Sequence, residues 1–78
     1  MQVNKQFNDN TMFLIEKMKF IREYKELTQE ELGKRLGVTR MEISSLESLS
    51  RNPSLNKFTT WANSLGYMVT LKRKSDIK

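Results

Sequence analysis

The stretch QEELGKRLGVTRMEISSLES, Gln29 to Ser48, decides the fold of this chain. It predicts two short helices, about Gln29–Leu36 and Arg40–Leu46, joined by a tight turn. Apolar side chains recur at three- and four-residue steps in both halves, which puts them on one face of each helix. The residues that we expect to share this small core are Leu32, Leu36, Val38, Ile43 and Leu46.

Two glycines stand where this arrangement leaves little room. Gly33 follows Leu32 at the point where two steeply crossing helices would come close, so only a small side chain should fit there. Gly37 ends the first helix where the chain must turn left-handed, a conformation that glycine adopts without strain. Together the two glycines are expected to fix the turn.

Each of the two helices also carries a start signal of the capping-box type. Thr28 is followed three residues later by Glu31, and Thr39 is followed by Glu42 at the same spacing. In such a box the threonine oxygen accepts a hydrogen bond from the backbone N–H three residues on, and the glutamate accepts one from the threonine's own N–H. We therefore expect Glu42 to be a capping residue; the alternative is that it reads cytosine.

Two further amphipathic helices flank this stretch. One is predicted at about Asn10–Lys25, and the other at about Leu55–Ser64, where Pro53 and Ser54 precede its start and Gly66 marks its end. The side chains expected to face the core are Leu14, Met18, Ile21 and Tyr24 from the first helix and Leu55, Phe58, Ala62 and Leu65 from the last, with Trp61 at the border.

After Gly66 the period of the pattern changes from helical to two. Tyr67, Val69 and Leu71 alternate with more polar neighbours, which predicts a half-buried strand. Such a strand has two candidate partners. One is the same strand of a second copy, which would make an antiparallel ribbon across the twofold axis of a homodimer; the other is Val3–Phe7 of the same chain in a monomer.

The amino-acid composition limits which functions the chain can have. The chain has 78 residues, enough for one domain, with loose ends expected at 1–6 and 74–78. It has no cysteine and no histidine, so we expect no catalytic site, no metal and no cofactor. Its 14 basic and 9 acidic residues give a net charge of +5, the sign of a polyanion binder. With neither a signal peptide nor an apolar run that could span a membrane, we expect a cytoplasmic protein.

The segment Ile21–Leu71 resembles the lambdoid phage repressor and Cro class of helix-turn-helix regulators, the Xre-type family. The motifs that carry the resemblance are Leu27–Leu32 (LTQEEL), Leu36–Arg40 (LGVTR), Ile43–Glu47 (ISSLE) and Arg51–Ser54 (RNPS). The resemblance implies a mainly all-α, four- to five-helix lambda-repressor-like DNA-binding domain, here with one C-terminal β-strand that could pair across a dimer.

The same resemblance implies a bacterial or phage-encoded, nucleoid-associated regulator that reads double-stranded DNA, most simply a repressor on a near-palindromic operator. Its second short helix, Arg40–Glu47, would lie in the major groove. With Ile43 and Leu46 inward, helical geometry exposes the expected base-reading residues Arg40, Met41, Ser44 and Ser45. The expected DNA-backbone contacts are Gln29, Thr39, Arg51 and Asn52. By position in the family, Arg22 and Glu47 form a structural pair.

Several alternatives stay open at this point. Arg40 could bind phosphate alone, and the basic run Lys72–Lys74 could be a solubilising edge, a phosphate contact or a contact for an acidic partner. The surface charges that we expect to be solvated are Lys34, Arg35 and Lys57. The family commonly has glycine where this chain has Leu49. The chain's ending looks more like an antitoxin that binds a toxin protein and autoregulates its operon, which is the alternative function.

Overall fold

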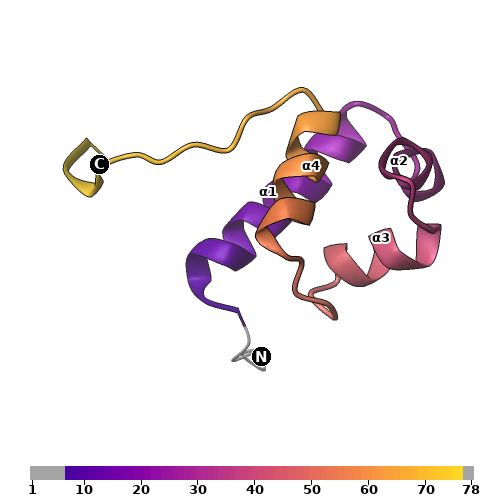
Figure 1. Cartoon of the computed structure of the whole chain (residues 1–78), viewed down its shortest axis with the longest axis horizontal. Helices are drawn as coiled ribbons and strands as arrows, with labels where there is room; N and C mark the ends of the chain where they lie inside the picture. The colour runs from indigo at the N-terminus through magenta and orange to yellow at the C-terminus, as the bar shows by residue number, and fades with distance from the viewer. Residues whose placement is uncertain (1–6, 77–78) are drawn as a thin grey trace.

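The structure, a computed structural model, describes residues 7–76. Within that range the chain forms four α-helices and a short 3-10 turn. The bounds are α1 (Asp9–Tyr24), α2 (Gln29–Leu36), α3 (Arg40–Glu47), α4 (Leu55–Ser64) and η1 (Lys74–Asp76). Figure 1 shows α2 and α3 together at one side, α1 and α4 nearer the middle, and the chain after α4 running away from the helices. The four predicted helices are confirmed, with bounds that differ by at most one residue at either end.

The turn between α2 and α3 requires glycine at both predicted positions. Gly33, however, lies close to a different group from the one expected. Gly37 has φ +72°, the left-handed conformation that ends α2. A Cβ placed on Gly33 would lie 2.7 Å from the carbonyl oxygen of Val38. The close approach is therefore to the backbone of the turn rather than to a facing helix. The turn can fold back onto α2 only because residue 33 has no side chain.

The core gathers apolar side chains from all four helices, from Phe7 before α1 and from Leu65 after α4. Its fully buried members are Phe7, Ile15, Met18, Ile21, Leu32, Ile43, Leu46, Trp61, Ala62 and Leu65. Leu36 and Val38, also expected there, pack against it while partly exposed. Helix α3 packs on α1 and α2, and α2 also packs on α4. The helix-turn-helix pair is thus held in a fixed orientation by the other two helices.

The predicted inward faces of the two flanking helices need correction. In α1 the core takes Ile15, whereas Leu14 is 36% exposed and Tyr24 is 80% exposed. In α4 the core takes Trp61 completely, whereas Leu55 is 75% exposed. The other predicted inward residues are confirmed: Met18, Ile21, Ala62 and Leu65 are buried, and Phe58 packs against the core while partly exposed.

The predicted C-terminal strand is wrong. Residues 7–76 contain no β-strand, and Tyr67, Val69 and Leu71 lie in an extended, exposed segment in which Leu71 is 97% exposed. A strand needs a hydrogen-bonded neighbour, and among residues 7–76 no segment pairs with Tyr67–Leu71 as a strand. Phe7 is buried in the helical core instead, and Val3 lies outside the described residues. The ribbon between two copies therefore loses its structural basis. Of the expected loose ends, Lys74–Asp76 forms η1, and 1–6 and 77–78 are not described.

The loop after α3 keeps a backbone conformation suited to glycine although the residue is leucine. Leu49 has φ +65°, in the left-handed region that side chains disfavour. Its side chain is half-buried and packs against the core. Burial of this side chain offsets the local strain, and the loop can turn toward α4 without glycine.

Candidate nucleic-acid interface

Helix α3 has one buried face and one exposed face, as expected of a helix that is presented to a ligand. Ile43 and Leu46 are completely buried, and Met41 is 68% exposed. Arg40, the first residue of the helix, is also exposed, whereas Ser44 and its neighbour Ser45 are half-buried. Of the four expected base-reading residues, Arg40 and Met41 are therefore the most accessible.

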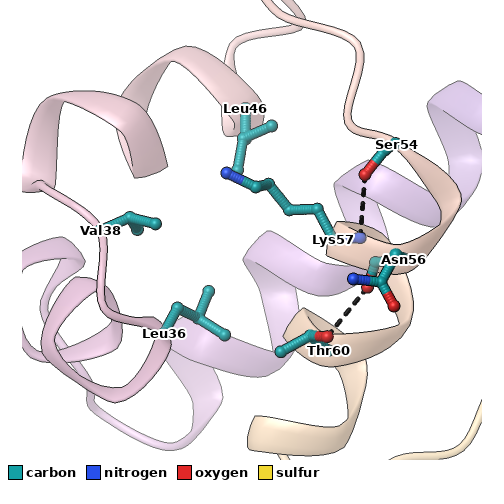
Figure 2. A pocket seen from close by; sticks show the side chains of 7 residues that line it. All are labelled: Leu36, Val38, Leu46, Ser54, Asn56, Lys57 and Thr60. Atoms are coloured by element: carbon teal, nitrogen blue, oxygen red, sulfur yellow. Dashed lines mark hydrogen bonds between the residues drawn. The ribbon is translucent and has the colours of Figure 1, made fainter.

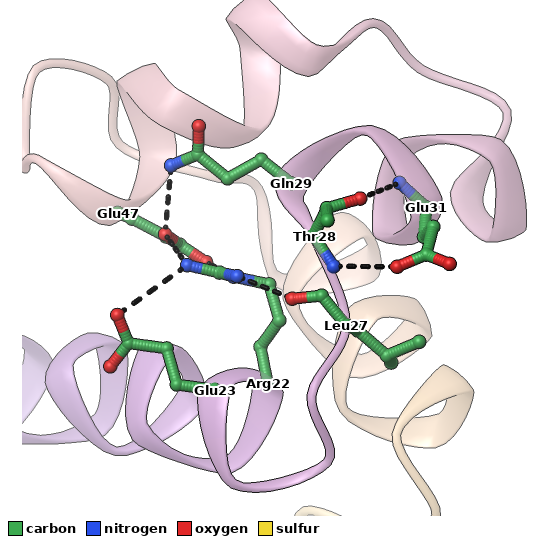
Figure 3. Close-up of polar contacts among 7 residues, drawn as sticks. All are labelled: Arg22, Glu23, Leu27, Thr28, Gln29, Glu31 and Glu47. Carbon is green, nitrogen blue, oxygen red and sulfur yellow. Dashed lines mark hydrogen bonds and ion pairs between the residues drawn. The ribbon is translucent and has the colours of Figure 1, made fainter.

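The expected pair of Arg22 and Glu47 lies in the core between α1 and α3 (Figure 3). The guanidinium donates from Nε to Oε2 of Glu47 at 2.6 Å and from Nη2 to Oε1 at 3.1 Å. It also donates to the carbonyl oxygen of Leu27. The two side chains are only 9% and 2% exposed. The hydrogen bond to Glu47 and the charge of that carboxylate raise the pKa of Arg22, against the opposing effect of burial.

This pair also positions a residue that the sequence assigned to the DNA backbone. The amide of Gln29 donates to Oε1 of Glu47 at 3.0 Å, across 18 residues of sequence. Gln29 is the first residue of α2, next to the completed capping box of Thr28 and Glu31. The contact between Gln29 and Glu47 had no signal in the sequence. It fixes the direction of the amide and leaves its second hydrogen for another acceptor.

The second capping box is only half formed. Thr39 accepts from the backbone N–H of Glu42 at 3.1 Å, as predicted, but the carboxylate of Glu42 does not return the bond. It forms ion pairs with Lys57 and, at 3.8 Å, with Arg51. The hydrogen bond from Lys57 is the main cause that lowers the pKa of the Glu42 carboxyl. Lys57 is therefore paired rather than free in solvent, whereas Arg35 is exposed and donates one hydrogen bond to the carbonyl oxygen of Ser64.

A small pocket of about 240 Å³ separates α4 from the helix-turn-helix pair. Its lining consists of Leu36, Val38, Leu46, Ser54, Asn56, Lys57 and Thr60. Figure 2 shows the side chain of Lys57 extending from α4 across this space toward α3. The closest helix packing of α3 is on α2 and α1, and the ion pair between Lys57 and Glu42 adds a polar link between α3 and α4.

The loop after α3 presents the remaining expected backbone contacts. The carbonyl oxygen of Ser45 accepts from the N–H groups of Ser50 and Arg51 at 2.9 and 3.2 Å. These bonds tie the loop to the end of α3. The side chain of Arg51 is 60% exposed, and Asn52 is exposed as well. Gln29 thus begins α2, Thr39 caps the start of α3, and Arg51 and Asn52 follow the end of α3.

No cluster of three or more acidic side chains suited to a metal ion occurs between residues 7 and 76. Over the same residues, no helix is long and apolar enough to cross a membrane.

Comparison with known proteins gives one match. The family model HTH_3, described as helix-turn-helix, matches residues 18–68, or 51 of the 78 residues. The matched segment begins inside α1 and includes all of α2, α3 and α4. Searches of curated proteins and of solved structures found no match. The chain therefore belongs to the HTH_3 helix-turn-helix family, whose Cro/C1-type, Xre-like members are DNA-binding transcription regulators.

Proposed function

We propose that this regulator binds a specific double-stranded DNA sequence and represses transcription by occupying it. The observation that carries the proposal is the division of α3 into a buried face, with Ile43 and Leu46, and an exposed face that begins with Arg40 and Met41. An α-helix fits the major groove, where each base pair shows a distinct pattern of donors, acceptors and methyl groups. Helix α3 would lie there.

In this proposal the exposed face of α3 reads bases. The Arg40 guanidinium can donate to O6 and N7 of guanine, a contact worth about 1–3 kcal/mol of discrimination. Met41 can pack against a thymine methyl group. Ser44 and Ser45 are short and half-buried, so they contribute only if the helix enters the groove deeply.

Contacts to phosphates would set the position of the helix without reading sequence. Gln29 is supported as such a contact by its place at the start of α2 and by the hydrogen bond from its amide to Glu47, which holds it in one direction. Thr39 stands at the N-terminal end of α3, and Arg51 and Asn52 stand beyond its C-terminal end. These four residues would touch the backbone on both sides of the reading face.

A homodimer would double the sequence that is read. A single eight-residue helix contacts few base pairs, whereas a twofold dimer on a near-palindromic operator reads two half-sites about 34 Å apart, or a multiple of that spacing. The proposal therefore includes dimerisation, on or before binding.

The direct test is selection of binding sites from random duplexes with the purified chain, followed by transcription of a reporter from the selected site. We expect one enriched site with inverted symmetry, and less transcript as protein is added. Recovery of duplexes without a common sequence would contradict specific reading. An increase in transcript would contradict repression while leaving specific binding intact.

A second candidate function is an antitoxin that binds a toxin protein and regulates its own operon. What favours it is the exposed apolar surface of α1, where Phe13 and Phe20 are about three-fifths exposed and Tyr24 is 80% exposed. The test is co-expression with the product of the neighbouring gene. A stable complex that neutralises that product would support the antitoxin function.

A further inference from the structure

We infer that the exposed face of α1 and the extended segment Tyr67–Leu71 form the interface of a homodimer, in which an aromatic ridge of each copy enters an apolar groove of the other. The ridge consists of Phe13, Phe20 and Tyr24. The groove lies between α1 and Tyr67–Leu71 of the same chain. The inference rests on the proposed function, which calls for a homodimer, and it names the surface through which the two copies meet.

The ridge lies on the side of α1 that faces away from the core. Phe13, Phe20 and Tyr24 follow one another at steps of seven and four residues, so they share one face of the helix. The rings of Phe20 and Tyr24 stack with their centroids 6.3 Å apart. A full aromatic side chain has about 150–250 Å² of surface, so the three rings, each more than half exposed, present about 400 Å² to solvent. An apolar patch of this size often has a function.

The groove beside the ridge has a volume of about 420 Å³. The apolar side chains that line it include Leu14, Met18 and Ile21 from α1 and Val69 and Leu71 from the extended segment. Figure 1 shows that this segment extends away from α2 and α3. The segment serves here as the wall of a groove and not as a β-strand.

Ridge and groove are neighbours on one helix, which suits an interface with twofold symmetry. Leu14 and Ile21 each follow a ridge residue in the sequence, so the groove wall lies about 100° around α1 from the ridge. The ridge cannot enter the groove of its own chain, because the same helix carries both. In a twofold pair the two copies present the same surface, so each ridge can enter the other copy's groove at once. A second copy is therefore the occupant that fits both features.

The charges that flank the ridge and the groove are complementary. Asp9, Glu16 and Glu23 recur every seven residues along α1 and form an exposed acidic row on the side of the ridge away from the groove. The basic run Lys72–Lys74 follows the apolar segment that makes the outer wall of the groove, and it is exposed as well. When a ridge enters the partner's groove, its acidic row comes beside the partner's basic run.

The exposed apolar area is sufficient for a stable dimer. The ridge, Leu14 and the apolar side chains of Tyr67–Leu71 together expose roughly 1,000 Å² per chain, against the ~800 Å² that each partner buries in a standard interface. The opposite face of α1, with Ile15 and Met18, is buried against the other helices. Association through the ridge therefore leaves the exposed face of α3 free for DNA.

The first test measures the oligomeric state of the full chain without DNA, by sedimentation equilibrium over a range of concentrations. We expect a dimer with twice the mass of the chain. Phe20→Gln and Leu71→Gln change exposed positions, so circular dichroism should show an intact fold while the dimer dissociation constant rises by about tenfold or more. Leu55→Gln is the control. Leu55 is 75% exposed and lies outside the groove, so its replacement should change that constant by less than about twofold.

A charge exchange tests whether the contact is between copies. One variant carries Glu16→Lys with Glu23→Lys, and the other carries Lys72→Glu with Lys74→Glu. Each variant alone places like charges across the interface, so each should dimerise about tenfold more weakly. The second variant also lowers the net charge of the chain toward zero, so its weaker association cannot come from overall repulsion. An equal mixture of the two places opposite charges at both contacts, and a mixed dimer should form.

Several results would overturn the inference. One is a wild type that stays monomeric at every concentration, with and without the selected operator. Another is a dimer that neither Phe20→Gln nor Leu71→Gln weakens, or a charge exchange without a mixed dimer. A monomer whose ridge is covered by the product of the neighbouring gene would support the antitoxin function instead. If the dimer depends on these residues but the chain selects no common DNA sequence, the proposed function fails while the interface stands.

Discussion

Arg22 of α1 and Glu47 at the end of α3 are joined by two hydrogen bonds of 2.6 and 3.1 Å inside the core. Breaking such a pair by removing one partner leaves a buried charge without compensation, which costs about 3–5 kcal/mol. We expect Arg22→Met to lower the free energy of unfolding by an amount in that range, as measured by urea titration. Replacing both residues, as in Arg22→Met with Glu47→Leu, should cost clearly less. A double variant as unstable as the single one would show that packing, rather than charge, causes the loss.

Arg40 and Gln29 should have different effects on DNA binding. Arg40→Ala is expected to weaken binding to the selected operator by about 1–3 kcal/mol and to leave binding to random DNA much less affected. Gln29→Ala should weaken both in similar proportion, because a phosphate contact carries no sequence information. Fluorescence anisotropy with the two duplexes makes the comparison. Equal losses for the two variants on both duplexes would contradict the assignment of these roles.

Gly33 should not tolerate even a methyl group. Alanine in a helix interior ordinarily stabilises by about 1 kcal/mol relative to glycine. At position 33, however, the added Cβ would lie 2.7 Å from the carbonyl oxygen of Val38, so the turn must move. We expect Gly33→Ala to lower the thermal midpoint, with an overpacking cost of about 1–3 kcal/mol. Glu30→Ala, at an exposed position of the same helix, is the control. A raised midpoint for Gly33→Ala would contradict the close approach.

Glu31, which completes a cap, and Glu42, which pairs with Lys57, should make stability depend on acidity. The backbone N–H of Thr28 lowers the pKa of Glu31, and the hydrogen bond from Lys57 lowers that of Glu42, both from an ordinary value of 4.5. A lowered pKa in the folded state means that the stabilising contribution is complete above about pH 4.5 and is lost as pH falls through the folded value. Thermal unfolding of the wild type should therefore weaken below that pH, and less steeply in Glu31→Gln. Identical slopes would contradict the capping contribution of Glu31.

The helices themselves could be predicted because their causes are local. Thr28 with Glu31, Gly37 and the three- and four-residue apolar steps define α2, and Ser54 begins α4 by accepting from the N–H of Lys57 as expected. The Arg22–Glu47 pair came from likeness to a family, since no local pattern joins residues 25 apart.

Other features of the structure depend on contacts between residues that are distant in the sequence. The sequence alone determined four helices, the glycine turn and the basic, cysteine-free composition of a nucleic-acid binder, because propensity, capping and charge act between near neighbours. Only the tertiary structure decided that Ile15 rather than Leu14 is buried, that Tyr67–Leu71 is no strand, and that Glu42 binds Lys57 instead of completing its cap. A strand requires a hydrogen-bonded neighbouring strand, and the Glu42 carboxylate binds the charged amine of Lys57 rather than the backbone N–H of Thr39. Both depend on residues that the fold alone brings near.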